Sequence, residues 1–362
     1  MKQDQSLLTF LAYKAAGIVV GFFTWVACLF ILLILLGSLA GSTDSSDVVE
    51  NELAYHSGDR DSSNKILSIP INGLILGDKD ELEGLGGLFS DLGVSYGYEI
   101  KEQLYEAAEN DDIKGVILEI NSPGGTIYGS QAISDGVKYY RDQTKKPVIS
   151  FINGLAASGG YWAAAAGDSI VADYGTSIGS IGVITGPFKY YNGVTSENAG
   201  ILGGGVVTQQ GIETFYITAG EHKDLGNPYR KMSETEVRNL QQAVNNEYEG
   251  FVTHVASHRK IEANHIKNTI KALIYDPSSA LQLKLIDQVA NRETAYEHVA
   301  KGAHLPEGRY QVVREESPAD FVETILKSQL LSFSASHQRQ QICSVSSQIL
   351  AYHGNVVDLC SP

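Results

Sequence analysis

Three short blocks of this chain carry residues that could do chemistry together: 121–125 (NSPGG), 156–161 (AASGGY) and 220–224 (GEHKD). The first two blocks are predicted glycine turns, which could present bare backbone N–H groups to a ligand. The second block places one serine hydroxyl, that of Ser158, at the expected start of a helix. The third supplies Lys223, whose amine could take the proton of that hydroxyl. Together they predict acyl transfer, which needs a nucleophile, a base and donors for the oxyanion.

Ser158 is the predicted nucleophile because its neighbours are small. Ala157 and Gly159 leave no bulk that would block a substrate carbonyl. The N–H of Gly159 is placed to donate to the oxyanion, and a helix starting there adds its partial positive charge. Gly125 or Gly124 could supply a second donor, since glycine lets a backbone approach a ligand closely. A serine before two glycines can also simply cap a helix, but the NSPGG block after an earlier strand favours catalysis.

Two adjacent residues, His222 and Lys223, could act as the base. A lysine serves as a base only when deprotonated, so the pKa of such a lysine must fall from about 10.4 to about 7–8, usually through burial. The apolar residues 215–217 (FYI) just upstream favour that burial. His222 needs no such shift, but the sequence identifies no carboxylate that would orient its ring. The residues alone leave both candidates open.

Composition and charge exclude several classes of function. The chain has 362 residues, of which 43% are hydrophobic and 19% charged, as in an ordinary folded protein. A net charge of −15 argues against a broad nucleic-acid surface. The three cysteines, Cys28, Cys343 and Cys360, form no CxxC pair, so we predict neither a cysteine metal site nor a redox centre. Whether Cys343 and Cys360 form a disulfide is left open.

The segment near the N-terminus is apolar enough to cross a membrane. Residues 15–43 contain no charged side chain, and 17–39 match the roughly 20 residues that a spanning helix requires. A cleaved signal peptide is the main alternative, but its apolar core would be shorter, about 7–15 residues. Lys2 and Lys14 favour a cytoplasmic N-terminus, 1–16. The domain that follows is therefore expected outside the cytoplasm, anchored in the inner or plasma membrane.

The remaining chain alternates predicted strands with short helices, which indicates an α/β fold with active groups at the strand ends. The predicted strands are 65–76, broken by a turn at 72–73, then 116–120, 148–152 and 169–172; the predicted helices are 98–109, 128–141, 158–166 and 233–258, the last capped by Ser233. Between and around them we expect a solvated linker at 40–64, a mobile loop at 84–97, a flexible excursion at 193–213 and a helix end feeding a short strand at 280–289.

The three blocks together resemble the signal peptide peptidase A family of membrane-bound serine peptidases, whose fold is similar to Clp protease and crotonase. The resemblance spans about residues 66–289 and requires no cofactor. It implies that Ser158 is the nucleophile and Lys223 the base, which leaves His222 as a bystander. It also implies that Ser180, in the segment GSIGVI, hydrogen-bonds the lysine amine and holds it toward the nucleophile. As an alternative, Ser180 is only a turn residue.

Members with one catalytic copy, as here, resemble short forms that assemble into homo-oligomeric rings, with the dyad completed across neighbouring protomers. The chain departs from the family at Trp162 and in the long stretch 193–213, which bears on the shape of the substrate pocket. The peptidase domain is expected at 65–317, followed by an extension, 318–362, to which no role is assigned.

The predicted function is that of a membrane-anchored serine endopeptidase with a Ser–Lys dyad, cleaving hydrophobic peptides such as remnant signal peptides. Two alternatives of other classes remain at this point. A crotonase-like enzyme of the same fold would bind acyl-coenzyme A tightly. A silent membrane scaffold would keep the fold while its Ser158 stays inert.

Overall fold

The computed structural model describes residues 53–78, 93–188, 190, 197–200, 203–206, 217–315 and 350–352. The predicted membrane segment 17–39, the three cysteines and most of the 318–362 extension lie outside these residues. Within the described ranges, no helix combines the length and the apolar character needed to cross a bilayer. The anchor therefore stays a prediction.

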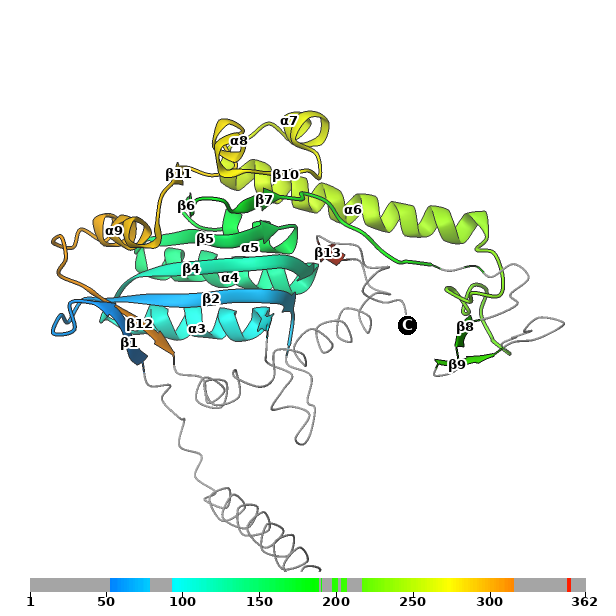
Figure 1. Ribbon diagram of the computed structural model, residues 1–362, viewed down its shortest axis with the longest axis horizontal. Coiled ribbons are helices and arrows are strands. Elements are labelled where there is room, and N and C mark those ends of the chain that lie inside the picture. The colour runs from blue at the N-terminus through cyan, green and yellow to red at the C-terminus, as the bar shows by residue number, and fades with distance from the viewer. Residues whose placement is uncertain are drawn as a thin grey trace, which may run out of the picture. The chain divides into compact units, whose positions relative to one another are not determined.

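A sheet of eleven strands forms the centre of the described chain, with the order β1-β12-β2-β4-β5-β6-β11 along its main path (Figure 1). The strands of this sheet are β1 (Leu53–Gly58), β2 (Lys65–Leu76), β3 (Val94–Tyr96), β4 (Ile113–Thr126), β5 (Val148–Ala157), β6 (Ser169–Ala172), β7 (Ser177–Gly179), β10 (Ile274–Tyr275), β11 (Gln288–Val289), β12 (Gln311–Glu315) and β13 (Leu350–Tyr352). All neighbours from β12 to β11 pair in parallel. The predicted α/β class is therefore confirmed.

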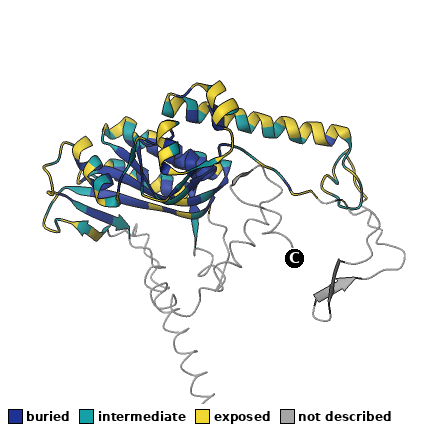
Figure 2. Cartoon of the chain, turned by 45° about the horizontal axis from the view of Figure 1, so that its top comes forward, coloured by how far each residue is buried: buried dark blue, intermediate teal, exposed yellow. Residues whose placement is uncertain are grey.

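Helices cover both faces of this sheet. They are α3 (Gly97–Glu109), α4 (Ile127–Thr144), α5 (Gly159–Ala165), α6 (Glu234–Arg259), α7 (Ala263–His265), the π-helical turn η1 (Ile266–Ile270), α8 (Pro277–Gln282) and α9 (Arg292–Gly302). Side chains of α3, α4, α5 and α6 share one core with the sheet, and α9 closes a second core on the other face. Figure 2 shows the buried residues gathered between these layers. Along each central strand, side chains point alternately into the first and the second core, as expected for a pleated strand that is buried on both faces.

Two of the predicted turns, at 72–73 and in the NSPGG block (121–125), are instead irregularities inside long strands. β2 passes through Asn72 and Gly73 with a shift in register, and Gly73 has φ of +65°. β4 likewise continues through the whole NSPGG block, and β5 continues to Ala157. A bulge changes the direction of a strand without ending its pairing, which propensity alone does not reveal. The carboxyl ends of β4 and β5 therefore lie at Thr126 and Ala157.

Three other segments differ from expectation. Residues 53–58, assigned to the linker, form the edge strand β1, antiparallel to β12. The predicted excursion contains the antiparallel strands β8 (Glu197–Gly200) and β9 (Gly203–Val206). In the predicted loop 84–97, residues 94–96 form β3, while 79–92 lie outside the described residues. β1 depends on a partner more than 250 residues away in the chain, and such pairing leaves no local signal.

Helix α6 begins where the sequence predicted, because Ser233 and Glu236 form a reciprocal capping box. Its C-terminal half is buried through Phe251, Val252 and Val255. Toward its N-terminus the helix is exposed, and half of the Val237 surface is open to solvent. Figure 1 shows this part of α6 running beyond the end of the sheet.

Candidate active site

Ser158 occupies a tight turn between β5 and α5. Its φ of +55° and ψ of −120° are a strained conformation for a residue with a Cβ. A strained strand-to-helix turn is a known way of presenting a nucleophilic serine. Gly160 makes the turn possible, because a Cβ at this position would lie 2.6 Å from the Ser122 carbonyl oxygen. Gly159 is the first residue of α5, so its N–H has no acceptor within the helix.

The segment after β7 lies directly against Ser158. The Ser158 N–H donates to the carbonyl oxygen of Gly179 at 2.9 Å, and its hydroxyl donates to that of Gly182 at 3.2 Å. Ser180 lies between these two contacts, almost buried, and its N–H donates to the Leu273 carbonyl oxygen at 2.7 Å. The structure therefore places Ser180 next to Ser158, while the predicted hydrogen bond from Ser180 to the lysine amine stays a prediction. Ser158 is fully buried, and the partner of its hydroxyl is the main-chain carbonyl oxygen of Gly182.

Gly124 and Gly125 lie near the end of β4, the strand next to the Ser158 turn. Ser122 pairs with Ala156 of β5, and its hydroxyl accepts the Gly124 N–H at 3.0 Å. Gly125 pairs with Ile75 of β2. On β4, residues 124–126 also pair antiparallel with β13, from the C-terminal part of the chain. An extended backbone therefore lies along β4 one strand away from the predicted nucleophile.

Lys223 is exposed and lies far from Ser158 of the same chain. Ser158 is attached to the C-terminal half of α6 through Trp162, whose ring lies 4.7 Å from that of Phe251. Lys223 is attached to the opposite end, because the neighbouring His222 contacts Glu236 at 3.3 Å. The 15 residues from Glu236 to Phe251 span about 22 Å of helix, at roughly 1.5 Å per residue. The structure therefore does not bring the predicted dyad together within one chain.

Trp162 was expected to shape the substrate pocket, but it is buried and attaches α6 to the core. Its ring stacks on His254 at 4.9 Å, and its indole N–H donates to Gln131 at 3.1 Å. Burial lowers the pKa of His254 to about 4, so its imidazole is neutral at pH 7 and bonds the Trp162 carbonyl at 2.9 Å. Trp162, the residue that departs from the family pattern, therefore helps to fix the position of α6 against the core.

His222, the alternative base, has carboxylates that sequence reasoning missed. Its Nδ1 lies 3.3 Å from Glu236 and its Nε2 lies 3.4 Å from Glu221. Both ring nitrogens therefore face carboxylates, which leaves neither of them directed at a serine hydroxyl. The capping signal placed Glu236 at the start of a helix, but it did not show that a loop histidine folds back onto it. Lys223 as the base stays a prediction.

Known proteins match the chain across this region. The model of peptidase family S49 matches residues 140–306, and that of Clp protease matches 90–171. A putative signal peptide peptidase SppA of Enterococcus faecium is 31% identical over 70% of this chain and 69% of its own length. The chain belongs to the SppA-like peptidases of family S49.

Two further relatives also carry protease names. A putative protease of Methanocaldococcus jannaschii is 34% identical over 56% of this chain and 60% of its own length. Protease 4 of Haemophilus influenzae is 27% identical over 63% of this chain, which spans 33% of that relative. This S49 member is therefore a serine-type peptidase with a Clp protease-like α/β fold. These matches do not favour the acyl-coenzyme A enzyme or the silent scaffold.

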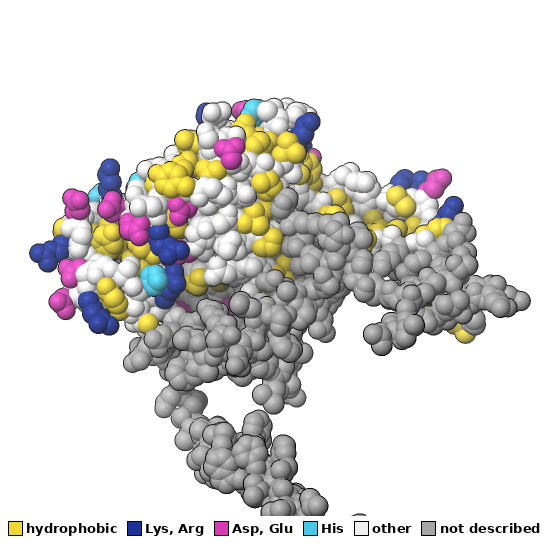
Figure 3. Space-filling model, in the orientation of Figure 1, with side chains coloured by type: hydrophobic (Ala, Val, Ile, Leu, Met, Phe, Trp, Pro, Cys, Tyr) yellow, Lys and Arg dark blue, Asp and Glu magenta, His cyan; other side chains and the backbone are white. Residues whose placement is uncertain are grey.

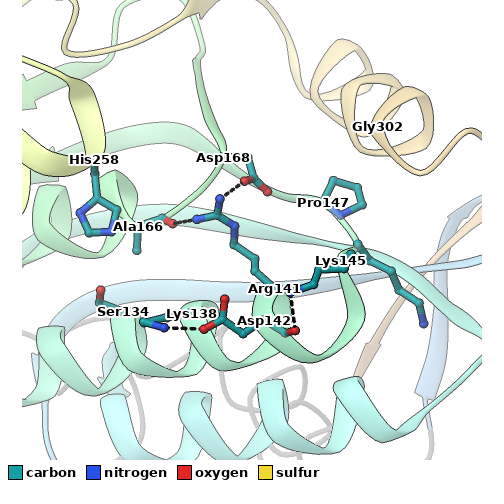
Figure 4. Close-up of a pocket in the computed structure, with 11 residues that line it drawn as sticks. Ser134, Lys138, Arg141, Asp142, Lys145, Pro147, Ala166, Asp168, His258 and Gly302 are labelled. Carbon is teal, nitrogen blue, oxygen red and sulfur yellow. Dashed lines mark hydrogen bonds and ion pairs between the residues drawn. The ribbon is translucent and has the colours of Figure 1, made fainter.

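This peptidase has a cavity of about 620 Å³, and Figure 4 shows the residues that line it. The cavity lies at the opposite ends of the strands from Ser158. It is lined by residues that precede β5 and β6, among them Pro147 and Asp168. Arg141 pairs with Asp168 across it. Ligands of open α/β sheets bind at the carboxyl ends of the strands, and this cavity lies at the amino ends. It is therefore distinct from the candidate active site.

Replacing Gly125 by alanine is expected to lower peptidase activity by about 100-fold, the effect of losing one oxyanion donor. A Cβ at this position would lie 1.9 Å from the Ile75 carbonyl oxygen, so β4 must move away from β2. Peptide hydrolysis and thermal unfolding, measured together, check this. Gly250→Ala is the matched control, because a Cβ there meets nothing within 4 Å. Wild-type activity in Gly125→Ala would exclude this segment from the site.

Proposed function

We propose that this S49 peptidase is a membrane-anchored endopeptidase in which Ser158 of one protomer works with Lys223 of its neighbour. The observation that carries the proposal is the strained turn at Ser158, with small residues around it and the glycine-containing end of β4 beside it. Such a turn costs on the order of 1–3 kcal/mol, and conformations of this kind cluster at active sites.

The separation within one chain supports a dyad built from two protomers. Lys223 lies beyond the exposed end of α6, roughly 20 Å from Ser158 by the helix geometry above. The apolar stripe of this half-helix, formed by Val237, Leu240 and Val244, is exposed or partly exposed. Figure 3 shows hydrophobic side chains along it. A second copy of this chain would cover the stripe and receive Lys223 at its own Ser158. Repetition of such a heterologous contact gives a ring when the rotation between neighbouring copies closes.

The edge of β4 supports a peptide substrate. β13 already lies antiparallel along residues 124–126, so this stretch of backbone accepts an extended chain. A substrate peptide would add to β4 in the same way, with main-chain hydrogen bonds holding it across the Ser158 turn. Tyr128, Ile184 and Phe188 follow the site segments and expose between 36% and 45% of their surfaces. Such side chains favour a hydrophobic peptide, for example a remnant signal peptide.

The proposed reaction is an acyl transfer through a covalent intermediate. The Ser158 oxygen attacks the scissile carbonyl carbon while its proton passes to the Lys223 amine. The N–H groups of Gly159 and Gly125 stabilise the oxyanion. When the C–N bond breaks, the lysine returns the proton to the leaving amine. Water then hydrolyses the acyl-enzyme with the same lysine as base, and Ser180 holds that amine in place.

Membrane attachment rests on residues 17–39 of the sequence. With Lys2 and Lys14 on the cytoplasmic side, the peptidase domain lies outside the cytoplasm, next to the bilayer in which hydrophobic peptides remain after processing.

Labelling with a fluorophosphonate probe tests the proposed function. In the detergent-solubilised full-length chain we expect modification at Ser158, read by mass spectrometry, and its loss in Ser158→Ala and in Lys223→Ala. His222→Ala is the control that separates the two adjacent bases, and it should retain labelling. Labelling that survives in folded, assembled Lys223→Ala would exclude the lysine as base.

A further inference from the structure

The loop that carries Lys223 is attached to α6 by one arginine. The Arg230 guanidinium donates to both oxygens of Asp224, at 2.8 and 2.6 Å, and to both oxygens of Glu236, at 2.9 and 2.7 Å. Asp224 immediately follows Lys223, and Glu236 is buried in the first turn of α6. These three residues form what we call the Arg230 clamp. Two bidentate contacts on one guanidinium fix both orientation and distance, which a lysine could not do.

The residue on the other side of Lys223 is tied to the same carboxylate. His222 lies 3.3 Å from Glu236 through Nδ1 and has φ of +67°, which is unusual for a residue with a Cβ. The backbone next to Lys223 is therefore held on both sides, while the lysine side chain itself stays exposed.

The clamp exceeds what capping the helix requires. Ser233 and Glu236 already form the capping box: the Ser233 N–H donates to Glu236 at 2.7 Å, and the Glu236 N–H donates to the Ser233 hydroxyl at 3.2 Å. Helix capping gives no reason for the second bidentate contact, from Arg230 to Asp224. That contact instead fixes the position of the loop that carries Lys223.

We propose that the Arg230 clamp is a positioning device that holds Lys223 as a fixed projection from the end of α6, ready to enter the site of a neighbouring protomer. This inference rests on the proposed function, in which Lys223 is the base. Arg230 is thus a positioning residue that acts through Lys223. A loop held in advance loses less conformational freedom when the site forms.

Charge gives the clamp a second effect on the lysine. Hydrogen bonds from Arg230 hold the pKa of Asp224 well below its usual range and lower that of Glu236 to about 2, so both are ionised. Anions near a lysine favour its protonated form, which cannot act as a base. The single positive charge of Arg230 offsets one of these two negative charges. The other charged groups on the same loop and helix end are Glu221, His222, Lys231, Glu234 and Arg238.

The test replaces Arg230 in the full-length, detergent-solubilised protein and measures cleavage of a short hydrophobic fluorogenic peptide. Arg230→Gln is expected to lower kcat by about 100-fold, with KM little changed, because the base is misplaced while the peptide site on β4 is intact. The acid limb of its pH–rate profile should move to higher pH, since Asp224 and Glu236 lose their shared counter-charge. Arg230→Lys restores the positive charge but not the two bidentate contacts. Its pH–rate profile should therefore return to that of wild type, while its kcat recovers only in part.

Arg238→Gln is the matched control. It makes the same change of side chain on the same end of α6, where Arg238 contacts the exposed Glu234 at 3.2 Å. Its kcat and pH profile should equal those of wild type. Thermal unfolding and size-exclusion chromatography of each variant report folding and assembly.

The inference is overturned if Arg230→Gln behaves like Arg238→Gln. It is equally overturned if the loss of kcat only follows the fraction of unfolded or unassembled protein while the pH profile stays in place, because that is a purely structural role. Lys223→Ala, assayed in parallel, separates the two levels. If Lys223→Ala stays active, the proposed function fails; if Lys223→Ala is inactive and Arg230→Gln is unaffected, only the positioning role fails.

Discussion

Assemblies containing equal numbers of Ser158→Ala and Lys223→Ala protomers are expected to show about one quarter of wild-type activity, although each variant alone is inactive. In a site built from two protomers, the serine comes from one chain and the lysine from the next. In random mixtures about half of the serines and half of the lysines are intact, so about one site in four has both. The separation of Lys223 from Ser158 along α6 is the reason to expect this result.

Co-expression of the two variants with different affinity tags, followed by tandem purification, ensures that the assemblies tested are mixed. The double variant, co-expressed with wild type in the same way, is the control: it carries the same number of altered residues but leaves intact sites only between wild-type neighbours. Full inactivity of the mixed single variants, in assemblies of wild-type size, would mean that serine and lysine must come from one chain.

Replacing Glu119 by alanine is expected to lower the free energy of unfolding by about 3 kcal/mol, because it removes the buried carboxylate that pairs with two partly buried arginines, Arg292 and Arg314. Glu119 lies on the central strand β4 and is 2% exposed. Its Oε1 accepts hydrogen bonds from Ser68 at 2.7 Å, Tyr296 at 2.9 Å and Arg314 at 2.8 Å. These partners come from β2, α9 and β12. Removal of the carboxylate therefore loosens three elements at once.

Chemical denaturation of the described domain checks this effect, with Asp112→Asn as the matched control. Asp112 pairs with Lys65 at 3.2 Å but is 58% exposed, so its loss should cost at most about 1 kcal/mol. Equal stability of the two variants would show that the Glu119 network contributes no more than a surface ion pair.

The same carboxylate predicts a dependence of stability on pH. Burial would raise the pKa of Glu119, but the hydrogen bond from Ser68 and the charge of Arg314 outweigh it and lower the pKa. Its contribution is therefore complete above the unfolded value of about 4.3 and is lost as pH falls through the lower folded value. The stability difference between wild type and Glu119→Gln should accordingly be constant near neutral pH and narrow below about pH 4.

Local patterns in the sequence were sufficient for the central strands and for several helices. The start of α6 follows from Ser233 and Glu236, which satisfy each other's backbone across one turn. The small residues around Ser158 predicted a glycine turn that leads into a helix. The structure has that turn, with the Ser158 side chain buried in it. Such signals reside within a few residues of each other, so they can be read without a fold.

Contacts between distant segments could not be read in this way. The Glu119–Arg314 contact joins residues 195 positions apart, and the strand pairing that carries β4 through NSPGG depends on β2 and β5. Even Arg230 and Glu236, six residues apart, meet only because the loop folds back onto α6. The residue types needed for a serine peptidase can thus be identified from the sequence alone. The distance between Ser158 and Lys223 depends on the packing of α6 against the core, because a rigid helix transmits that packing over its full length.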